Sequence, residues 1–202
     1  MNICLHFTVF TLEKILLNPS LSSSIRLFSQ QYVEAFKQQF NHSPLVEVDE
    51  NWPSPCIIQP FDEQLNEWQP QNIEQELTFN NVEQALAIEL HPDIRQYFTT
   101  IFSENIAATC EHGELSLLFA WSEGDFSRLQ ENIIGHILMK QKLKQNLTVF
   151  FALTDDENFI LSINNSDGTV WVERIGCEPH KKLANSLHEF FQCLTPFIFI
   201  EE

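Results

Sequence analysis

Carboxylates are the side chains of this sequence that are best placed, by number and position, to bind another molecule. The chain of 202 residues has 28 Asp and Glu against 11 Lys and Arg, so its formal net charge is −17. The stretch between Lys37 and Arg95 contains eleven carboxylates and no Lys or Arg: Glu47, Asp49, Glu50, Asp62, Glu63, Glu67, Glu74, Glu76, Glu83, Glu89 and Asp93. This stretch can form one acidic face, although acidic loops more often serve only to keep a protein soluble.

The charge also limits the classes of partner. Nucleic acid and anionic lipid head groups are themselves anionic, so we expect neither as a direct ligand. A basic protein is the natural complement of this chain.

Residue types that often carry catalysis occur without the patterns that catalysis requires. The chain has five glycines and neither of the Gly-rich phosphate-binding motifs. Ser122 lacks the flanking glycines of a nucleophile elbow, and His136 is interpreted as a satisfied interfacial residue. The adjacent acids Asp155, Asp156 and Glu157 are interpreted as a solvated turn. The sequence therefore predicts no catalytic residue.

The cysteines give no sign of a metal site or of disulfides. Five cysteines, an odd number without a C-x-x-C pair, are typical of reduced thiols in the cytosol. A zinc site could be assembled from Cys177, His180, His188 and Cys193, but their spacing matches no standard zinc motif. We predict no metal and no cofactor.

The elements that would position any site are organised around residues 113–144. Leu115, Leu117, Phe119 and Trp121 alternate with smaller residues, which predicts a strand over 114–121. Ser122 and Asp125 have the spacing of a capping box, so a long helix should begin near Glu123. Its apolar stripe should pack on a sheet, with Arg128, Glu131, Asn132 and Lys140 facing outward. Gly135 in mid-helix predicts that another backbone approaches closely there.

The remaining pattern predicts an α+β fold, a largely antiparallel sheet backed by helices. Helices are expected from Ser22 or Ser24 to Phe40, from a cap at Asn80 or Asn81 to Leu90, from Pro92 through Ile101 and Phe102, and over 179–194. Short strands and loops should fill 41–72, with the tryptophans against the body. Strands are expected over 106–112 and 147–153, the latter central, and as a hairpin of 159–163 with 170–172 around Asp167 and Gly168.

Residues 1–21 are predicted to be an appended segment, and residues 22–202 to be one domain. Pro19 and the serines after it interrupt the pattern of the opening segment. The apolar run 3–10 is too short to span a bilayer and lacks the basic start of a signal peptide, so we expect a soluble chain that is not exported.

Seven short segments together resemble a known family. They are 121–126 (WSEGDF), 130–136 (QENIIGH), 52–57 (WPSPCI), 68–70 (WQP), 82–83 (VE), 97–100 (YFTT) and 183–187 (LANSL). Taken together, these segments resemble the Syd family, the SecY-interacting proteins of enteric-type bacteria. The resemblance runs from about residue 28 to residue 194, while the first 21 residues and 197–202 depart from it.

The resemblance implies the SUKH fold, whose sheet forms an acidic concave surface, and a cytosolic monomer without enzymatic activity. It also implies docking on SecY at the cytoplasmic side of the inner membrane, with a role in monitoring or disrupting faulty translocon complexes. Membrane association should then be peripheral and run through the protein partner. The alternatives are a SUKH-type immunity protein that neutralises a toxin and a nucleic-acid mimic that competes for a basic protein.

If the protein docks on SecY, we expect the binding residues to be carboxylates around the rim of one concave face. The candidates are Glu83, Glu89, Glu114, Glu123 and Asp125. Capping explains Asp125, and solvation explains the helical glutamates, without any binding role.

Overall fold

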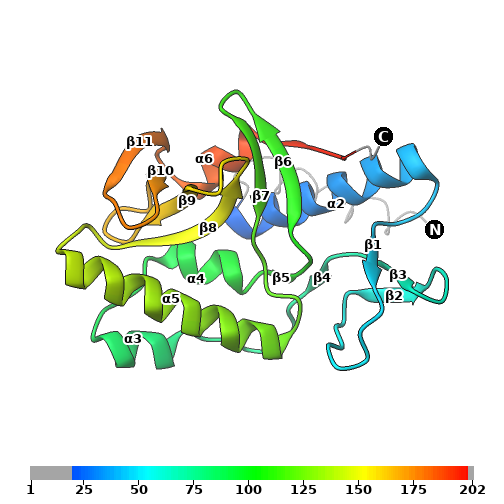
Figure 1. Ribbon diagram of the computed structural model, residues 1–202, viewed down its shortest axis with the longest axis horizontal. Helices are drawn as coiled ribbons and strands as arrows, with labels where there is room; N and C mark the ends of the chain where they lie inside the picture. The colour runs from blue at the N-terminus through cyan, green and yellow to red at the C-terminus, as the bar shows by residue number, and fades with distance from the viewer. Residues whose placement is uncertain (1–19, 200–202) are drawn as a thin grey trace, which may run out of the picture.

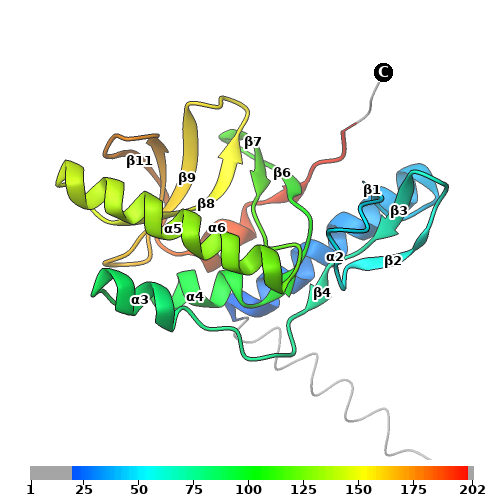
Figure 2. The same cartoon turned by 60° about the horizontal axis from the view of Figure 1, so that its bottom comes forward.

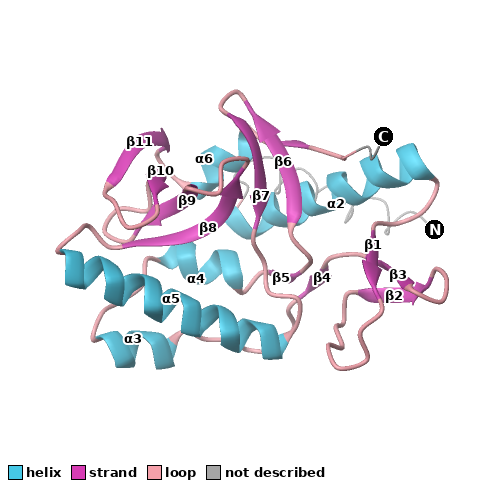
Figure 3. Ribbon diagram, in the orientation of Figure 1, coloured by secondary structure: helices cyan, strands magenta, loops and turns pink. Residues whose placement is uncertain are grey.

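In residues 20–199, which the computed structural model describes, a seven-stranded antiparallel sheet forms the centre of the molecule (Figures 1 and 3). Its strands, in spatial order, are β11 (Pro179–Ala184), β10 (Val170–Arg174), β9 (Phe159–Asn164), β8 (Thr148–Thr154), β7 (Gly113–Leu117), β6 (Ile106–Cys110) and β12 (Thr195–Pro196). The predicted hairpin is β9 and β10, and β8 is central as expected. Residues 1–19, most of the predicted appended segment, and residues 200–202 lie outside this description.

Helices flank the sheet. The described part of the chain has α2 (Leu21–Phe40), α3 (Asn80–Leu86), α4 (Pro92–Phe98), α5 (Glu123–Leu143) and α6 (Leu187–Gln192). α5 packs against α3 and β8, whereas α2 packs against α4, α6 and β12. Figure 1 shows α2 behind β6 and β7 and α5 below the sheet, and the turned view of Figure 2 brings α5 in front of it. The predicted α+β class, an antiparallel sheet backed by helices, is confirmed.

Residues 41–68 form a small lobe beside α2, at the right of Figure 1. A three-stranded sheet in the order β1-β3-β2 builds it, with β1 (Leu45–Glu47), β2 (Ile57–Pro60) and β3 (Leu65–Trp68). A second short pair, β4 (Gln71–Asn72) with β5 (Ile101–Phe102), follows it. Trp68 is buried and Trp52 packs on the core, so the expectation of short strands with tryptophans against the body is confirmed.

Within residues 113–144, the predicted start of the long helix is confirmed, whereas the predicted strand extends too far. Ser122 caps α5, since its hydroxyl accepts from the Asp125 amide, and α5 begins at Glu123. β7 ends at Leu117 rather than at Trp121. After Leu117 the chain turns toward β5, where Ala120 forms an isolated bridge with Phe102. Alternating side chains therefore continue beyond the end of the strand.

Two helix predictions before β6 are wrong at their ends. α3 stops at Leu86, because Ala87 adopts a left-handed conformation, and Asn80 is its first helical residue rather than its cap. α4 begins with Pro92 as predicted but ends at Phe98. Ile101 and Phe102 belong to β5 instead, where backbone pairing with β4 outweighs their helical spacing.

The predicted helix over 179–194 is also wrong. Residues Pro179–Ala184 form β11, which pairs with β10, and α6 begins only after Ser186 caps its first turn. β11 is the second strand of a hairpin with β10, and pairing with this preceding strand outweighs the helical spacing of its apolar residues.

The first described helix begins slightly earlier than predicted. Ser20 caps α2 by accepting from the Ser23 amide, and Leu21 is already buried. A boundary at residue 22 would remove both the cap and the first core residue of this helix.

Gly135 lies on the exposed side of α5, where an added Cβ would meet no atom within 4 Å. The predicted close approach of another backbone at this glycine is therefore wrong. Within residues 20–199, no helix combines the length and the apolar character needed to cross a bilayer.

The register of the large sheet gives each of its faces a different character. Leu117, Ala152 and Leu161 are cross-strand neighbours, as are Leu161 and Val172, so these apolar side chains share one face. On the opposite face, toward α5, Ser162 of β9 lies beside Glu173 of β10. One face is thus apolar, and the face under α5 contains a polar cluster.

Candidate functional site

A hollow of about 240 Å³ opens on the apolar face of the sheet, between the β6–β7 hairpin and β11. Leu115, Leu161 and Val172 form its floor, and Phe159 and Leu183 contribute to its walls. The acidic and basic residues that line it are Glu114, Asp155, Asp156, His112, His180 and Lys181. The hollow therefore combines an apolar floor with a charged rim.

The acidic part of the rim comes from two hairpin turns. Glu114 stands at the start of β7, and Asp155 and Asp156 follow β8. Hydrogen bonds from the Asn158 backbone N–H and side-chain amide lower the pKa of Asp156 below its ordinary value.

The basic part of the rim comes from β11. Lys181 Nζ lies 3.3 Å from Nδ1 of His112, and His112 Nε2 lies 3.6 Å from the Glu111 carboxylate. This chain of contacts runs across the opening from β11 to the β6–β7 hairpin. The carboxylates at the other side, Glu114 and Asp155, make no ion pair with Lys or Arg of the described segment.

The structure places the five predicted binding residues in three locations. Glu114 alone lines the hollow. Glu83 and Glu89 share Arg95, whose guanidinium lies 2.9 Å from the first carboxylate and 3.6 Å from the second. The Glu83 carboxylate also accepts from the Leu90 amide, so it fixes the α3–α4 connection. Glu89 is 83% exposed.

Glu123 and Asp125 lie together in the first turn of α5, which is far from the tip of the β6–β7 hairpin in both ribbon views (Figures 1 and 2). Asp125 accepts from the Trp121 amide and donates its own amide to Ser122, which completes the capping box. Glu123 is exposed. A binding role for these five residues remains a prediction.

Asp155 and Asp156 line the hollow but were not among the predicted binding residues. They were interpreted as a solvated turn, and they are indeed exposed in a turn. The signal that could have found them is pairing: Thr154 of β8 lies opposite Leu115 of β7, which brings the end of β8 beside Glu114. Sequence alone does not give this register.

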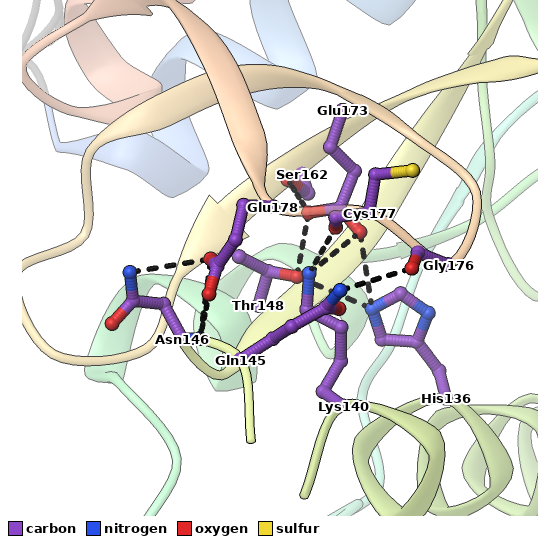
Figure 4. Close-up of polar contacts among 10 residues, drawn as sticks. All are labelled: His136, Lys140, Gln145, Asn146, Thr148, Ser162, Glu173, Gly176, Cys177 and Glu178. Atoms are coloured by element: carbon purple, nitrogen blue, oxygen red, sulfur yellow. Dashed lines mark hydrogen bonds and ion pairs between the residues drawn. The ribbon is translucent and has the colours of Figure 1, made fainter. Parts of the chain in front are cut away.

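The opposite face contains a buried ion pair (Figure 4). Lys140 Nζ of α5 lies 3.2 Å from Oε1 of Glu173 in β10, and both side chains are 0% exposed. Thr148 and Ser162 donate to the other carboxylate oxygen at 2.7 and 2.9 Å. Buried charges are stable only when paired and hydrogen-bonded in this way. The prediction that Lys140 faces outward is therefore wrong.

His136, one turn before Lys140, completes this polar cluster. Its Nε2 lies 3.7 Å from Glu173 and 3.3 Å from the Thr148 hydroxyl. Burial lowers the pKa of His136 below 6.5, and Lys140 adds to this effect, while Glu173 opposes it. The imidazole is satisfied at an interface, as predicted.

The C-terminal end of α5 also holds the turn that leads into β11. Lys140 Nζ donates to the Cys177 carbonyl at 2.8 Å, and Gln145 donates to the Gly176 carbonyl at 2.9 Å. The Asn146 amide donates to the Glu178 carboxylate (Figure 4). Because β11 forms one wall of the hollow, the buried cluster supports that wall from the other face of the sheet.

The four residues considered as zinc ligands, Cys177, His180, His188 and Cys193, do not lie together. Cys177 leads into β11 while Cys193 follows α6, and His188 bonds to Ser24 of α2. In the described range, no group of three His, Cys, Asp or Glu residues could hold a metal ion.

Comparison with known proteins gives one consistent family. The profile described as Syd protein (SUKH-2) matches residues 22–196. Protein Syd of Colwellia psychrerythraea is 57% identical, over 88% of this chain and 94% of the relative. Protein Syd of Alteromonas mediterranea is 44% identical over 88% and 97%, and that of Yersinia pestis is 37% identical over 89% and 97%. The chain belongs to the Syd (SUKH-2) family.

Proposed function

We propose that this protein is a non-enzymatic binding protein that docks on cytoplasmic loops of SecY through the acidic side of the hollow. The observation that carries the proposal is the hollow itself, an apolar floor beside unpaired carboxylates on a chain of net charge −17. SecY is the partner that the family resemblance implies.

Charge favours this kind of partner over the membrane surface. Cytoplasmic loops of membrane proteins are enriched in Lys and Arg, whereas the cytoplasmic leaflet itself is anionic. A strongly acidic protein is attracted to the loops and repelled by bare lipid. Its membrane association would therefore be peripheral and depend on the protein partner.

The hollow has the chemistry to hold one long basic side chain. The aliphatic stem of Lys or Arg can lie on Leu115, Leu161 and Val172, because such side chains cover apolar surface while their charged ends remain in water. The charged end would then meet Glu114 and Asp155. Neutral or acidic side chains would lose this pairing, so the rim selects for a cation.

The test measures binding of the full chain to purified SecY in lipid nanodiscs. A variant with Glu114→Lys and Asp155→Lys should lose most of the binding, and the wild-type on-rate should fall as salt rises, because the Debye length is only about 8 Å at 0.15 M. A second double variant, Glu131→Lys with Glu34→Lys at exposed positions of α5 and α2, provides a control with the same change in net charge.

The melting temperature of each variant is measured alongside the binding. Undiminished binding by the hollow variant, or binding that is insensitive to salt, would show that another surface carries the contact. Equal loss in the hollow variant and in the control variant of the same net charge would show that only net charge matters.

A further inference from the structure

A continuous series of aromatic rings runs from the core to the surface of the small lobe. Trp121 contacts Trp68 with ring centroids 5.9 Å apart, and Trp68 stacks on Tyr32 of α2 at 6.4 Å. Tyr32 contacts Phe36 at 6.3 Å, and Phe36 contacts Phe40 at 4.7 Å. The inner rings explain how the lobe is anchored to the body.

The outer end of this series is open to water. His42 lies 6.0 Å from Phe40 and 4.8 Å from Phe61 between their centroids. Phe61 is 46% exposed, and Phe36, Phe40 and His42 are each partly exposed. We call these four residues the outer aromatic patch. An exposed apolar patch with a polar border is typical of an interaction site.

The small lobe beside the patch is acidic, although Lys37 of α2 lies next to Phe36. Residues 41–68 contain six carboxylates and no Lys or Arg: Glu47, Asp49, Glu50, Asp62, Glu63 and Glu67. Glu67 accepts from the Ser43 amide beside His42, and Asp62 directly follows Phe61. Among the described residues, no ion pair involves any of the six.

An aromatic ring of this lobe already binds a cation from elsewhere in the chain. The Arg128 guanidinium of α5 lies 3.7 Å from the ring centroid of Trp52. A guanidinium over an aromatic face is attracted by the ring electrons, more strongly when water is excluded. The lobe thus combines two features that favour cations, ring faces and unpaired carboxylates.

We infer that the outer aromatic patch is a second docking surface, for a protein segment in which Lys or Arg alternates with apolar side chains. Apolar side chains of the segment would cover Phe40 and Phe61, and its cations would pair with Glu67 and Asp62. This surface is separate from the hollow, and the inference holds whether or not the hollow binds SecY.

Charge excludes the other occupants that an exposed aromatic patch could have. A second copy of this chain would bring another −17 charge to an acidic border. Anionic lipid and nucleic acid would be repelled for the same reason. A cationic protein segment is the occupant that both the rings and the carboxylates favour.

The test uses the full chain and a synthetic peptide of alternating Arg and Leu, with a second peptide of alternating Arg and Ser as the equal-charge control. Backbone amide shifts in NMR should change around Phe40, His42 and Phe61 on addition of the first peptide. Phe61→Ser should weaken its binding about tenfold, as loss of an aromatic anchor does. Leu153→Ser, at a comparably exposed apolar residue on β8, should leave binding unchanged.

The Arg–Ser peptide should bind at least several-fold more weakly than the Arg–Leu peptide, since it keeps the charge and loses the apolar contact. Equal binding of the two peptides, equal effects of Phe61→Ser and Leu153→Ser, or shifts spread over α3 and α5 would overturn the inference. Glu114→Lys at the hollow should leave the shifts in the lobe in place, which separates this surface from the proposed SecY contact.

Discussion

On the α5 side of the large sheet, Lys140 and Glu173 are fully buried and bonded to each other, whereas Glu114 and Asp155, at strand ends beside the hollow, are exposed to water. Attraction between opposite charges is strong in a dry interior and weak in water. The buried groups lose their hydration, so each depends on its partner. The exposed groups keep their hydration and remain available to a partner from outside.

Carboxylates of this sheet therefore stand in two kinds of surroundings, one that fixes structure and one that leaves the side chain free for the proposed contact. Carboxylates that already have hydrogen bonds and a buried cation, such as Glu173, hold elements in place. Carboxylates with open surroundings, such as Glu114, contribute little to folding, because exposed ion pairs stabilise a protein by at most about 1 kcal/mol.

The largest expected effect comes from breaking the buried pair. Glu173→Gln or Lys140→Met alone should lower the free energy of unfolding by about 3–5 kcal/mol, because each leaves one buried charge without its partner. The double variant should cost less than the sum of the two single changes. Urea denaturation of the four proteins measures this, and additive costs would show that the two side chains act independently.

A smaller effect should appear as a dependence of stability on pH. The pKa of His136 is lowered in the folded protein by burial, so below 6.5 the unfolded chain binds a proton that the folded protein does not. The contribution of His136 to the free energy of unfolding is therefore fully present above pH 6.5, and it is lost as the pH falls toward the pKa of the folded protein. Denaturation curves on both sides of pH 6.5 measure the slope.

His136→Asn gives the control for that slope. This variant should show a flatter dependence of stability on pH in the same window than the wild-type protein. If His136→Asn leaves the slope unchanged, the pH dependence arises from other titratable groups and not from His136.

The smallest expected effect is on the open side of the sheet. Glu114→Gln and Asp155→Asn should each change the free energy of unfolding by less than about 0.5 kcal/mol, because neither side chain is buried or bonded to a cation. Urea denaturation against wild type checks this. A loss comparable to that of Glu173→Gln would mean that the rim is structural, and the contrast between the faces would fail.

Sequence reasoning worked where the physical cause is local. Ser122 and Asp125 form the predicted cap because both partners lie within one turn. The β9–β10 hairpin is confirmed for the same reason, since Gly168 in its turn has the positive φ angle of 73° that glycine tolerates. The family resemblance also lies in such short segments.

It failed where the cause is a distant partner. Lys140 was expected outside because a charged helical residue is normally solvated, and only Glu173 of another strand makes its burial possible. The error at Pro179–Ala184 has a different cause, since its partner β10 is the preceding strand: the helical spacing of the apolar residues after Leu183 was extended too far toward the N-terminus. The residues that rim the hollow depend on long-range register, so the sequence alone could name only Glu114 among them.

β11 also ends the seven-stranded sheet, and its outer edge has no neighbouring strand in the described chain. Lys181 and Lys182 are exposed on this edge strand, and charged lysines there discourage another sheet from adding to it. The opposite edge strand, β12, is only two residues long and ends at Pro196, which has no amide hydrogen to donate. Both edges of the large sheet thus carry features that oppose strand-to-strand association between molecules.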